Sequence, residues 1–209
     1  MAAQSNPSLA DLLDPDGAGA GHRDRILAGM IAAVVERGYA ATTITDVVRH
    51  ARVSRRTFYE HFGDKQACFL AAYDAVSDAI LSAIEGAAAE HQDWRERIVA
   101  GVRAYLQGLA MEPEIARVFT VDVLSAGPDA LQRRRGVLRR FAGSLRDQVD
   151  AAVTAGGPGR RISDATSLAL AGAIHELVLE ALEEERGAEL PALEGDIADL
   201  VAAAVIGPG

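Results

Sequence analysis

The chain has 209 residues, of which 49% are apolar and 24% are charged, and its formal net charge is −9. This balance is typical of a globular protein and excludes a chain that is disordered throughout. No apolar run reaches the roughly 18 residues of a membrane span, and no basic, apolar leader marks the start as a secretory signal. We therefore expect a cytoplasmic protein without a membrane partner, built as one large domain or two small ones.

The charge is unevenly distributed along the chain. Residues 1–21 hold three aspartates and no basic residue, and residues 22–65 hold eight basic residues against five acidic ones. Residues 66–209 hold thirteen arginines against twenty-two acidic residues. A small basic block joined to a larger acidic body indicates that any nucleic-acid contact is confined to the block.

An apolar stripe predicts the first helix. Ile26, Met30 and Val34 recur every fourth residue, as one face of a helix requires. Gly38 is expected to end this helix, because glycine adopts the left-handed backbone conformation found after many helix ends.

Two further short helices are expected next. The second covers residues 45–51, and either Thr43 or Thr45 caps it. The third runs from its cap at Ser54 to His61. A tight turn between them gives the layout of a helix-turn-helix unit.

Longer helices are predicted for the rest of the chain, because apolar residues keep helical spacing and no alternating strand pattern or internal repeat appears. The fold class is therefore all-α, with an N-terminal three-helix helix-turn-helix domain and a C-terminal helical bundle. The division expected is a flexible tail at 1–21, the helix-turn-helix at 22–65 and the bundle at 66–209. The longer helices are expected at 64–89, 93–109, 113–127 in one or two pieces, a long one ending at 156–159, 163–186 and 191–205.

The third helix is the candidate reading element. An arginine there can bond a guanine edge through two hydrogen bonds, and a threonine can contact a thymine methyl group. Tyr59, His61 and Lys65 are placed to touch phosphates. The alternatives are a solvated helix face for the arginines, a surface charge for Lys65 and a half-buried side chain for His61. The expected DNA-contacting set is Thr43, Thr45, Ser54, Arg55, Arg56, Thr57, Tyr59, His61 and Lys65.

A dense run of residues carries a resemblance to a known family. The run comprises Arg25-Ile26-Leu27, Gly38-Tyr39, Thr42 to Val47, and Val53 to Lys65, with Thr57-Phe58-Tyr59-Glu60-His61-Phe62 as its most specific part. It resembles the TetR family of transcriptional regulators, except that Cys68 stands where a larger apolar residue is more usual. The resemblance implies that Tyr59 and Lys65 contact phosphate, and that Arg55, Arg56 and Thr57 lie in the major groove.

The resemblance also implies the partners. They are a palindromic operator in double-stranded DNA, a second copy of the chain, and a small apolar or amphipathic effector bound by the C-terminal domain. No cofactor is implied. The activity expected under this resemblance is that of a ligand-responsive repressor, and an activator is the alternative.

The last two long helices are candidates for the homodimer interface. The helix at 163–186 carries two apolar seams, one through Leu168 and Val178 and one through Leu170 and Ile174. A helix that is apolar on two sides must bury both, so one side is expected to face its own core and the other a second subunit. A monomer with a thick core fits the same pattern.

The effector pocket is sought among large side chains of the body, since ligand sites are mostly apolar. Plain core positions are the alternative for each residue, and a hydrogen-bonded core position is the alternative for the histidine. The candidates are Trp94, Tyr105, Met111, Phe119, Phe141 and His175.

The five arginines within 133–140 have two interpretations. They either form an anion site or, as we favour, line a solvated face paired with Glu183, Glu184 and Glu185.

Other classes of function have little support in the sequence. The single cysteine, Cys68, excludes an internal disulfide and a metal cluster of cysteines alone, and no histidine pair has zinc-ligand spacing. No nucleophile elbow, Walker lysine or strand-led dinucleotide motif is present, so we expect neither an enzyme nor a metal site. A helical interaction module that has lost DNA binding is the remaining alternative.

Overall fold

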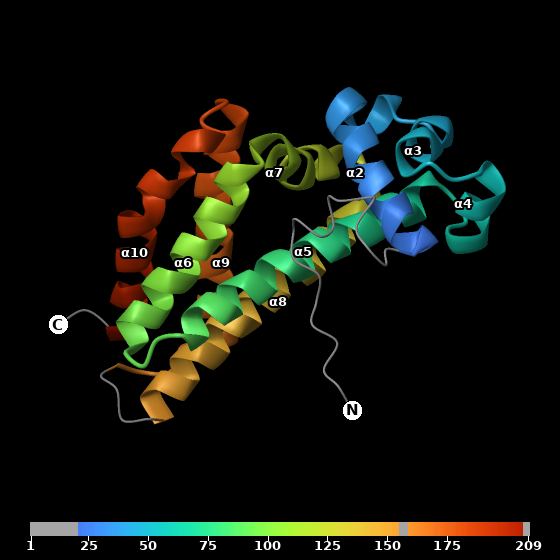
Figure 1. The fold of residues 1–209 in the computed structure, drawn as a ribbon. Helices are drawn as coiled ribbons and strands as arrows, with labels where there is room; N and C mark the ends of the chain where they lie inside the picture. The colour runs from blue at the N-terminus through green and yellow to red at the C-terminus, as the bar shows by residue number, and fades with distance from the viewer. Residues whose placement is uncertain (1–20, 155–158, 207–209) are drawn as a thin grey trace. The chain divides into compact units, whose positions relative to one another are not determined.

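The computed structural model describes residues 21–154 and 159–206, and within these ranges the only regular secondary structure is helical (Figure 1). The all-α expectation is confirmed. The predicted flexible tail at 1–21 lies outside the described residues except for Gly21. The helices of the described ranges are α2 His22–Ala41, α3 Ile44–Ala51, α4 Arg55–His61, α5 Lys65–Ala89, α6 Trp94–Met111, α7 Pro113–Thr120, α8 Pro128–Thr154, α9 Asp164–Glu183 and α10 Glu194–Ile206.

Short 3-10 helices interrupt the pattern at two places. One, Asp122–Ser125, lies between α7 and α8, and the other, Gly187–Leu193, lies between α9 and α10. The second contains Pro191. The sequence predicted a helix starting at Pro191, whereas in the structure this residue lies within the 3-10 helix and the α-helix begins at Glu194.

The described chain divides into two compact units. The first joins residues up to Ser82 with Arg117–Arg133, and the second joins Ala83–Ala116 with residues from Arg134 onward. Helices α5, α7 and α8 each contribute residues to both units. The functional division at residue 65, predicted from the sequence, stays a prediction.

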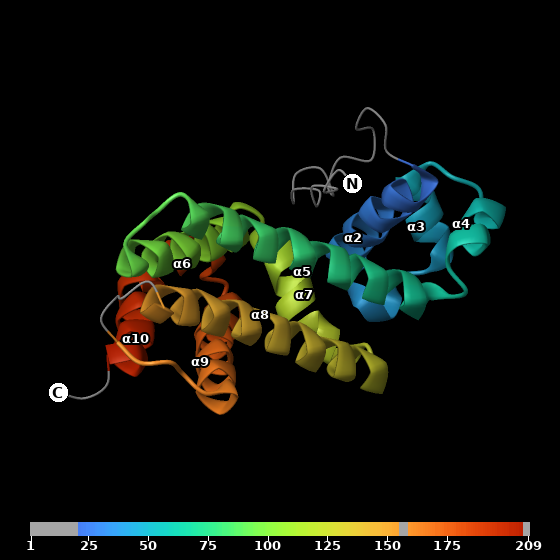
Figure 2. The ribbon, with the colours of Figure 1, turned by 90° about the horizontal axis from the view of Figure 1, so that it is seen from below.

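The core of the first unit lies under α2, α3 and α4, which gather around the start of α5 in Figures 1 and 2. Ile26, Met30 and Val34 are each at most 1% exposed, as the apolar stripe predicted. A row of aromatic rings continues this core. The Phe69 ring stacks on Phe119 with centres 5.8 Å apart and contacts Tyr39 at 4.5 Å.

The core of the second unit joins α6, α8, α9 and α10 and is drawn mainly in light green, orange and red in Figure 1. Its buried members include Trp94 and Ile98 of α6, Val149 of α8 and Leu170 of α9. Helices α6 and α10 contact each other, and Figure 1 shows them side by side.

Two helices are long and apolar enough to cross a membrane when judged by length and composition alone. They are α5, Lys65–Ala89, and α9, Asp164–Glu183. The sequence analysis expected no stretch of this kind, and this criterion of length and composition contradicts that expectation. Core helices of soluble proteins pass the same test, and Phe69 and Tyr73 of α5 are buried in the first unit, so these helices are weak support for a membrane protein.

Candidate nucleic-acid interface

Helix α2 forms the platform for the interface, and it approaches α3 closely at Gly29. A Cβ atom added there would lie 2.7 Å from both the Ala51 amide nitrogen and the Val47 carbonyl oxygen. Only glycine permits this approach, because non-bonded heavy atoms do not come so near. Gly29 therefore fixes how deeply α3 packs on α2.

The break after α2 is held by a buried threonine. Gly38 has a φ of +73°, which interrupts the helix where the sequence predicted its end. The Thr42 hydroxyl donates to the carbonyl oxygens of Ala33 and Gly38 at 3.0 and 2.8 Å. These bonds satisfy carbonyls left free at the break and set the direction in which the chain enters α3.

Helix α3 is capped at its start by Thr43, one of the two residues proposed for this role. The Thr43 hydroxyl accepts from the Asp46 amide, and the Asp46 carboxylate accepts from the Thr43 amide at 2.9 Å. The Thr43 hydroxyl also lies 2.6 Å from the Asp46 carboxylate and can donate to it, and this bond together with that from the Thr43 amide lowers the pKa of Asp46. Thr43 thus has a structural role beside its predicted DNA contact.

The α3–α4 turn has the predicted position and a left-handed residue at its centre. Arg52 has a φ of +51°, and Ser54 caps α4 by accepting from the Thr57 amide at 3.0 Å. The Val53 amide donates to the Val48 carbonyl at 3.2 Å. The turn is thus tied at both ends, which fixes α4 relative to α3.

Helix α4 buries one face and exposes the other. Phe58 is fully buried, whereas Tyr59 is 50% exposed and the Arg56 side chain is 90% exposed. Arg55 is also exposed, and its guanidinium donates to the Thr45 hydroxyl at 3.5 Å, which places these two predicted contacts side by side. Their common surface is the face of α4 directed away from the core.

The remaining predicted contacts lie at the edges of that face. His61 is exposed rather than half-buried, and its ring centre is 6.3 Å from that of His22. Thr57 is half-buried beside its cap residue. Arg56 pairs with Glu60 at 3.1 Å, an exposed pair that costs little to break when another anion approaches.

Lys65, the only lysine of the chain, is engaged within the protein. Its ammonium group donates to the carbonyl oxygens of Tyr39 and Thr42 at 2.9 and 3.0 Å and lies 4.3 Å from the centre of the Tyr39 ring. A lysine ammonium has three donors, so one remains for a phosphate. The sequence did not predict these two internal bonds, because their acceptors lie at the end of α2, more than twenty residues before Lys65.

The predicted pocket residues do not form one cluster. Tyr105 of α6 and Phe141 of α8 have ring centres 6.1 Å apart and are half-buried. Phe119 packs on Phe69 in the first unit, and Met111 is 79% exposed. Among these four, only Tyr105 and Phe141 are brought together.

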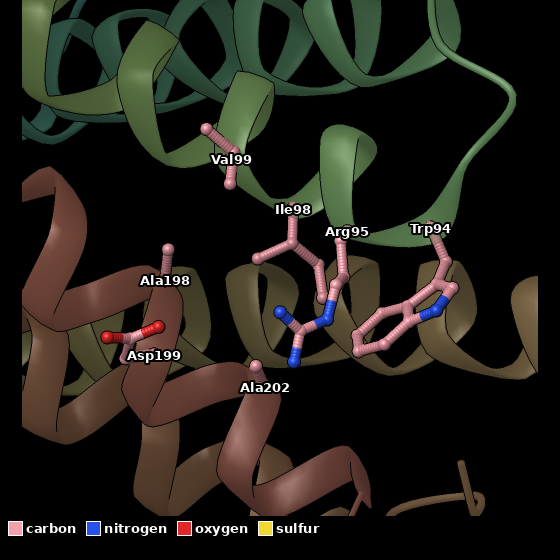
Figure 3. Close-up of a pocket in the computed structure, with 7 residues that line it drawn as sticks. All are labelled: Trp94, Arg95, Ile98, Val99, Ala198, Asp199 and Ala202. Atoms are coloured by element: carbon pink, nitrogen blue, oxygen red, sulfur yellow. The ribbon is translucent and has the colours of Figure 1, made fainter. Parts of the chain in front are cut away.

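Trp94 lines a groove between α6 and α10, shown in Figure 3. Its cavity volume is about 50 Å³, far below the usual range for a ligand site. None of the other predicted pocket residues lines it. The lining residues are Trp94, Arg95, Ile98, Val99, Ala198, Asp199 and Ala202.

His175 is largely buried on α9. Burial and the nearby positive charge of Arg134 lower its pKa to about 4, so the imidazole is neutral at pH 7. Its Nε2 atom has no hydrogen-bond partner in the described part of the chain, and neither has the buried Nε atom of Arg134. The alternative of a hydrogen-bonded core histidine is thus not met at the Nε2 atom of His175. Arg134 was not singled out by the sequence, which predicted it only as part of a run of arginines.

The favoured pairing of that arginine run with Glu183, Glu184 and Glu185 is not found for Arg133 or for Glu184. Arg133 pairs with Asp74 at 2.7 Å, and Glu184 pairs instead with Arg186. Arg133 of α8 and Asp74 of α5 meet because their helices pack together, whereas Arg186 and Glu184 are only two residues apart in the chain.

The single thiol and the acidic groups offer little for catalysis or metal binding. Cys68 is buried, and desolvation raises its pKa to about 12, so the thiolate needed for redox chemistry is not formed near neutral pH. Within residues 21–154 and 159–206, no three His, Cys, Asp or Glu side chains are grouped to hold a metal ion.

Comparisons with known proteins give one consistent result. Residues 26–72 match the family model of the bacterial regulatory proteins of the tetR family. The chain is 28% identical over 111 residues to the transcriptional regulator AlkX of Mycobacterium tuberculosis, covering 53% of this chain and 51% of that protein. It is 30% identical over 83 residues to the transcriptional activator FasR of Mycolicibacterium smegmatis, covering 40% and 38%. The chain thus spans about half or less of these relatives.

A solved structure shares the whole fold. The regulator FadR of Bacillus subtilis in complex with stearoyl-CoA superposes with a TM-score of 0.75 over 87% of this chain and 98% of that one, at 15% identity. The capped α3–α4 pair and the exposed basic face of α4 define a helix-turn-helix DNA-binding regulator. The family match covers the same helices and the start of α5, so residues 26–72 are similar to the DNA-binding part of the TetR family of transcriptional regulators.

Proposed function

We propose that the chain is a ligand-responsive repressor that acts in the cytoplasm and binds a palindromic operator as a homodimer. Residues 22–65 contact DNA in this proposal, and residues 66–209 bind the effector and pair the subunits. The observation that carries the proposal is the exposed face of α4, on which Arg55, Arg56 and Tyr59 stand above the buried Phe58. Two such helices enter major grooves about 34 Å apart on one side of the duplex.

Exposed apolar side chains on α9 and α10 support the dimer. Leu168 is 37% exposed, Leu200 is 38% exposed and Ile206 is 48% exposed, although neighbours on the same helices are buried. Burial of these side chains against the same helices of a second copy removes apolar surface from water, which stabilises association.

The effector proposed is a small amphipathic molecule that binds in the second unit. The structural relative FadR was solved with stearoyl-CoA, an amphipathic ligand. The half-buried rings of Tyr105 and Phe141 supply an apolar surface for such a molecule in this chain. Binding releases DNA if the effector favours a dimer with wrongly spaced reading helices.

A gel-shift titration with the promoter region beside the protein's own gene tests DNA binding. We expect a shift whose affinity falls steeply with salt, with a slope near −0.9 per phosphate neutralised. The variant Arg55→Ala/Arg56→Ala should lose the shift, and Arg139→Ala, an exposed arginine of α8, should keep it. A shift that is absent or insensitive to salt favours an interaction module.

A reporter gene under the same promoter separates repression from activation. The relative FasR is an activator, so the direction needs its own test. We expect reporter expression to rise when the gene for this protein is deleted. A fall in expression would assign activation instead.

A further inference from the structure

Two unpartnered nitrogen atoms lie buried in the second unit. One is Nε of Arg134 on α8, and the other is Nε2 of His175 on α9. Neither finds a hydrogen-bond partner among the described residues. Because a buried polar group without a hydrogen-bond partner destabilises the folded chain, two such groups call for an explanation by a ligand.

The charge of this pair favours an anion. The Arg134 guanidinium is cationic at any pH in the physiological range, and no ion pair of the described residues involves it. His175 is neutral at pH 7 because burial and Arg134 lower its pKa to about 4, so it adds no charge but retains a ring nitrogen for hydrogen bonding. An anionic oxygen would neutralise the arginine and satisfy it through a charge-assisted bond.

The face of α8 that carries Arg134 continues as an apolar surface. Arg134, Leu138 and Phe141 are spaced by four and three residues, so they form one stripe that rises about 10 Å from Arg134 to Phe141. The Phe141 ring meets Tyr105 of α6, and all three apolar side chains are only half-buried. The stripe therefore offers a polar end and an apolar end to one elongated molecule.

We propose that Arg134 and His175 bind the anionic head group of an amphipathic effector whose tail lies along Leu138, Phe141 and Tyr105. The proposal rests on the proposed function, because it names the chemical class of its effector. The head group is an anionic oxygen, supplied either by a free carboxylate or by the phosphates of an acyl-CoA.

Calorimetric titration of the full chain with dodecanoate, dodecanoyl-CoA and dodecanol tests the head group. We expect at least one of the two anions to bind about tenfold or more tighter than dodecanol, since a charge-assisted hydrogen bond contributes roughly this factor. Which anion binds separates the two sources. Equal affinity for the anions and dodecanol, or no binding by either anion, overturns the proposal.

Variants locate the contact. Arg134→Gln should lose about tenfold in affinity for the anion and keep its affinity for dodecanol, whereas Arg135→Gln, an exposed neighbour, should bind both as the wild type does. Arg134→Lys keeps the charge and should retain part of the preference for the anion if Arg134→Gln fails to fold. Unchanged anion binding by the folded variants overturns the proposal.

A gel shift with the same probes separates this proposal from the proposed function. If the anion binds through Arg134 without releasing DNA, the head-group site stands and effector-controlled release fails. If dodecanol releases DNA and Arg134→Gln responds like the wild type, effector control stands and the head-group site fails.

Discussion

The ammonium group of Lys65 lies between two acceptors of the same residue, the carbonyl oxygen of Tyr39 at 2.9 Å and its ring centre at 4.3 Å. A further bond to the Thr42 carbonyl at 3.0 Å makes Lys65 a clamp between the first turn of α5 and the end of α2. That end leads directly into α3, so the clamp fixes the segment from which the reading helix follows.

Removal of the clamp should weaken the fold. We expect Lys65→Met to lower the free energy of unfolding by about 1.5–3 kcal/mol, because two charge-assisted hydrogen bonds are lost and their carbonyls stay partly buried. Urea denaturation followed by circular dichroism measures the change. Arg56→Met, at a side chain that is 90% exposed, is the control and should stay within about 0.5 kcal/mol of the wild type. Equal effects would show that the internal bonds contribute nothing.

The salt dependence of DNA binding separates the two roles of Lys65. If its third N–H contacts a phosphate, as we propose, Lys65→Met should reduce the slope of log K against log salt by about 0.9. Tyr59→Phe should weaken binding to all sequences without a change of slope, since a phenol carries no charge at pH 7. A Lys65→Met variant with the wild-type slope would assign this residue to the clamp alone.

Sequence preference should depend on Arg55. The exposed guanidinium lies next to Thr45 of the first turn of α3, where a base edge is in reach in the proposed complex. We expect Arg55→Ala to relax the preference at one operator position, at a cost of roughly 1–3 kcal/mol for the preferred base. Selection of binding sites from a randomised operator measures this preference. A uniform loss across all positions would reassign Arg55 to phosphate contact.

The close approach of α2 and α3 should tolerate no added methyl group. Gly29→Ala places a Cβ atom 2.7 Å from two backbone atoms of α3, so we expect a loss of about 1–3 kcal/mol in stability and weaker DNA binding. Gly86→Ala on α5, where a Cβ atom meets nothing within 4 Å, should instead gain about 0.5–1 kcal/mol. Thermal denaturation compares the pair, and a stable Gly29→Ala protein would contradict the packing described here.

Acid should destabilise the protein through His175. Its pKa is about 4 in the folded chain and 6.5 for an ordinary histidine, so the unfolded chain takes up the proton first as the pH falls. Stability from this group is fully present above pH 6.5 and declines by about 3 kcal/mol between pH 6.5 and 4. We expect His175→Leu to lose less stability over this interval than the wild type, measured by urea denaturation at each pH. If stability falls equally with pH in the wild type and in His175→Leu, the pKa of His175 is not lowered in the folded protein.

The sequence by itself determined the helical fold and the order of the first four helices. Ser54 caps α4 as expected, and Thr43, one of the two candidates, caps α3, because an N-cap bonds to an amide two or three residues away. The apolar stripe of α2 and the buried Phe58 were also predicted, since helical spacing alone decides which side chains share a face.

Only the tertiary structure decided which distant groups meet. Lys65 finds acceptors 23 and 26 residues away, and Arg133 pairs with Asp74 rather than with the acidic run after α9. The unpartnered nitrogens of Arg134 and His175 likewise follow from the packing of α8 on α9. Periodicity gives the buried face of each helix but neither the crossing angle nor the axial offset between two helices, and these two quantities determine every such contact.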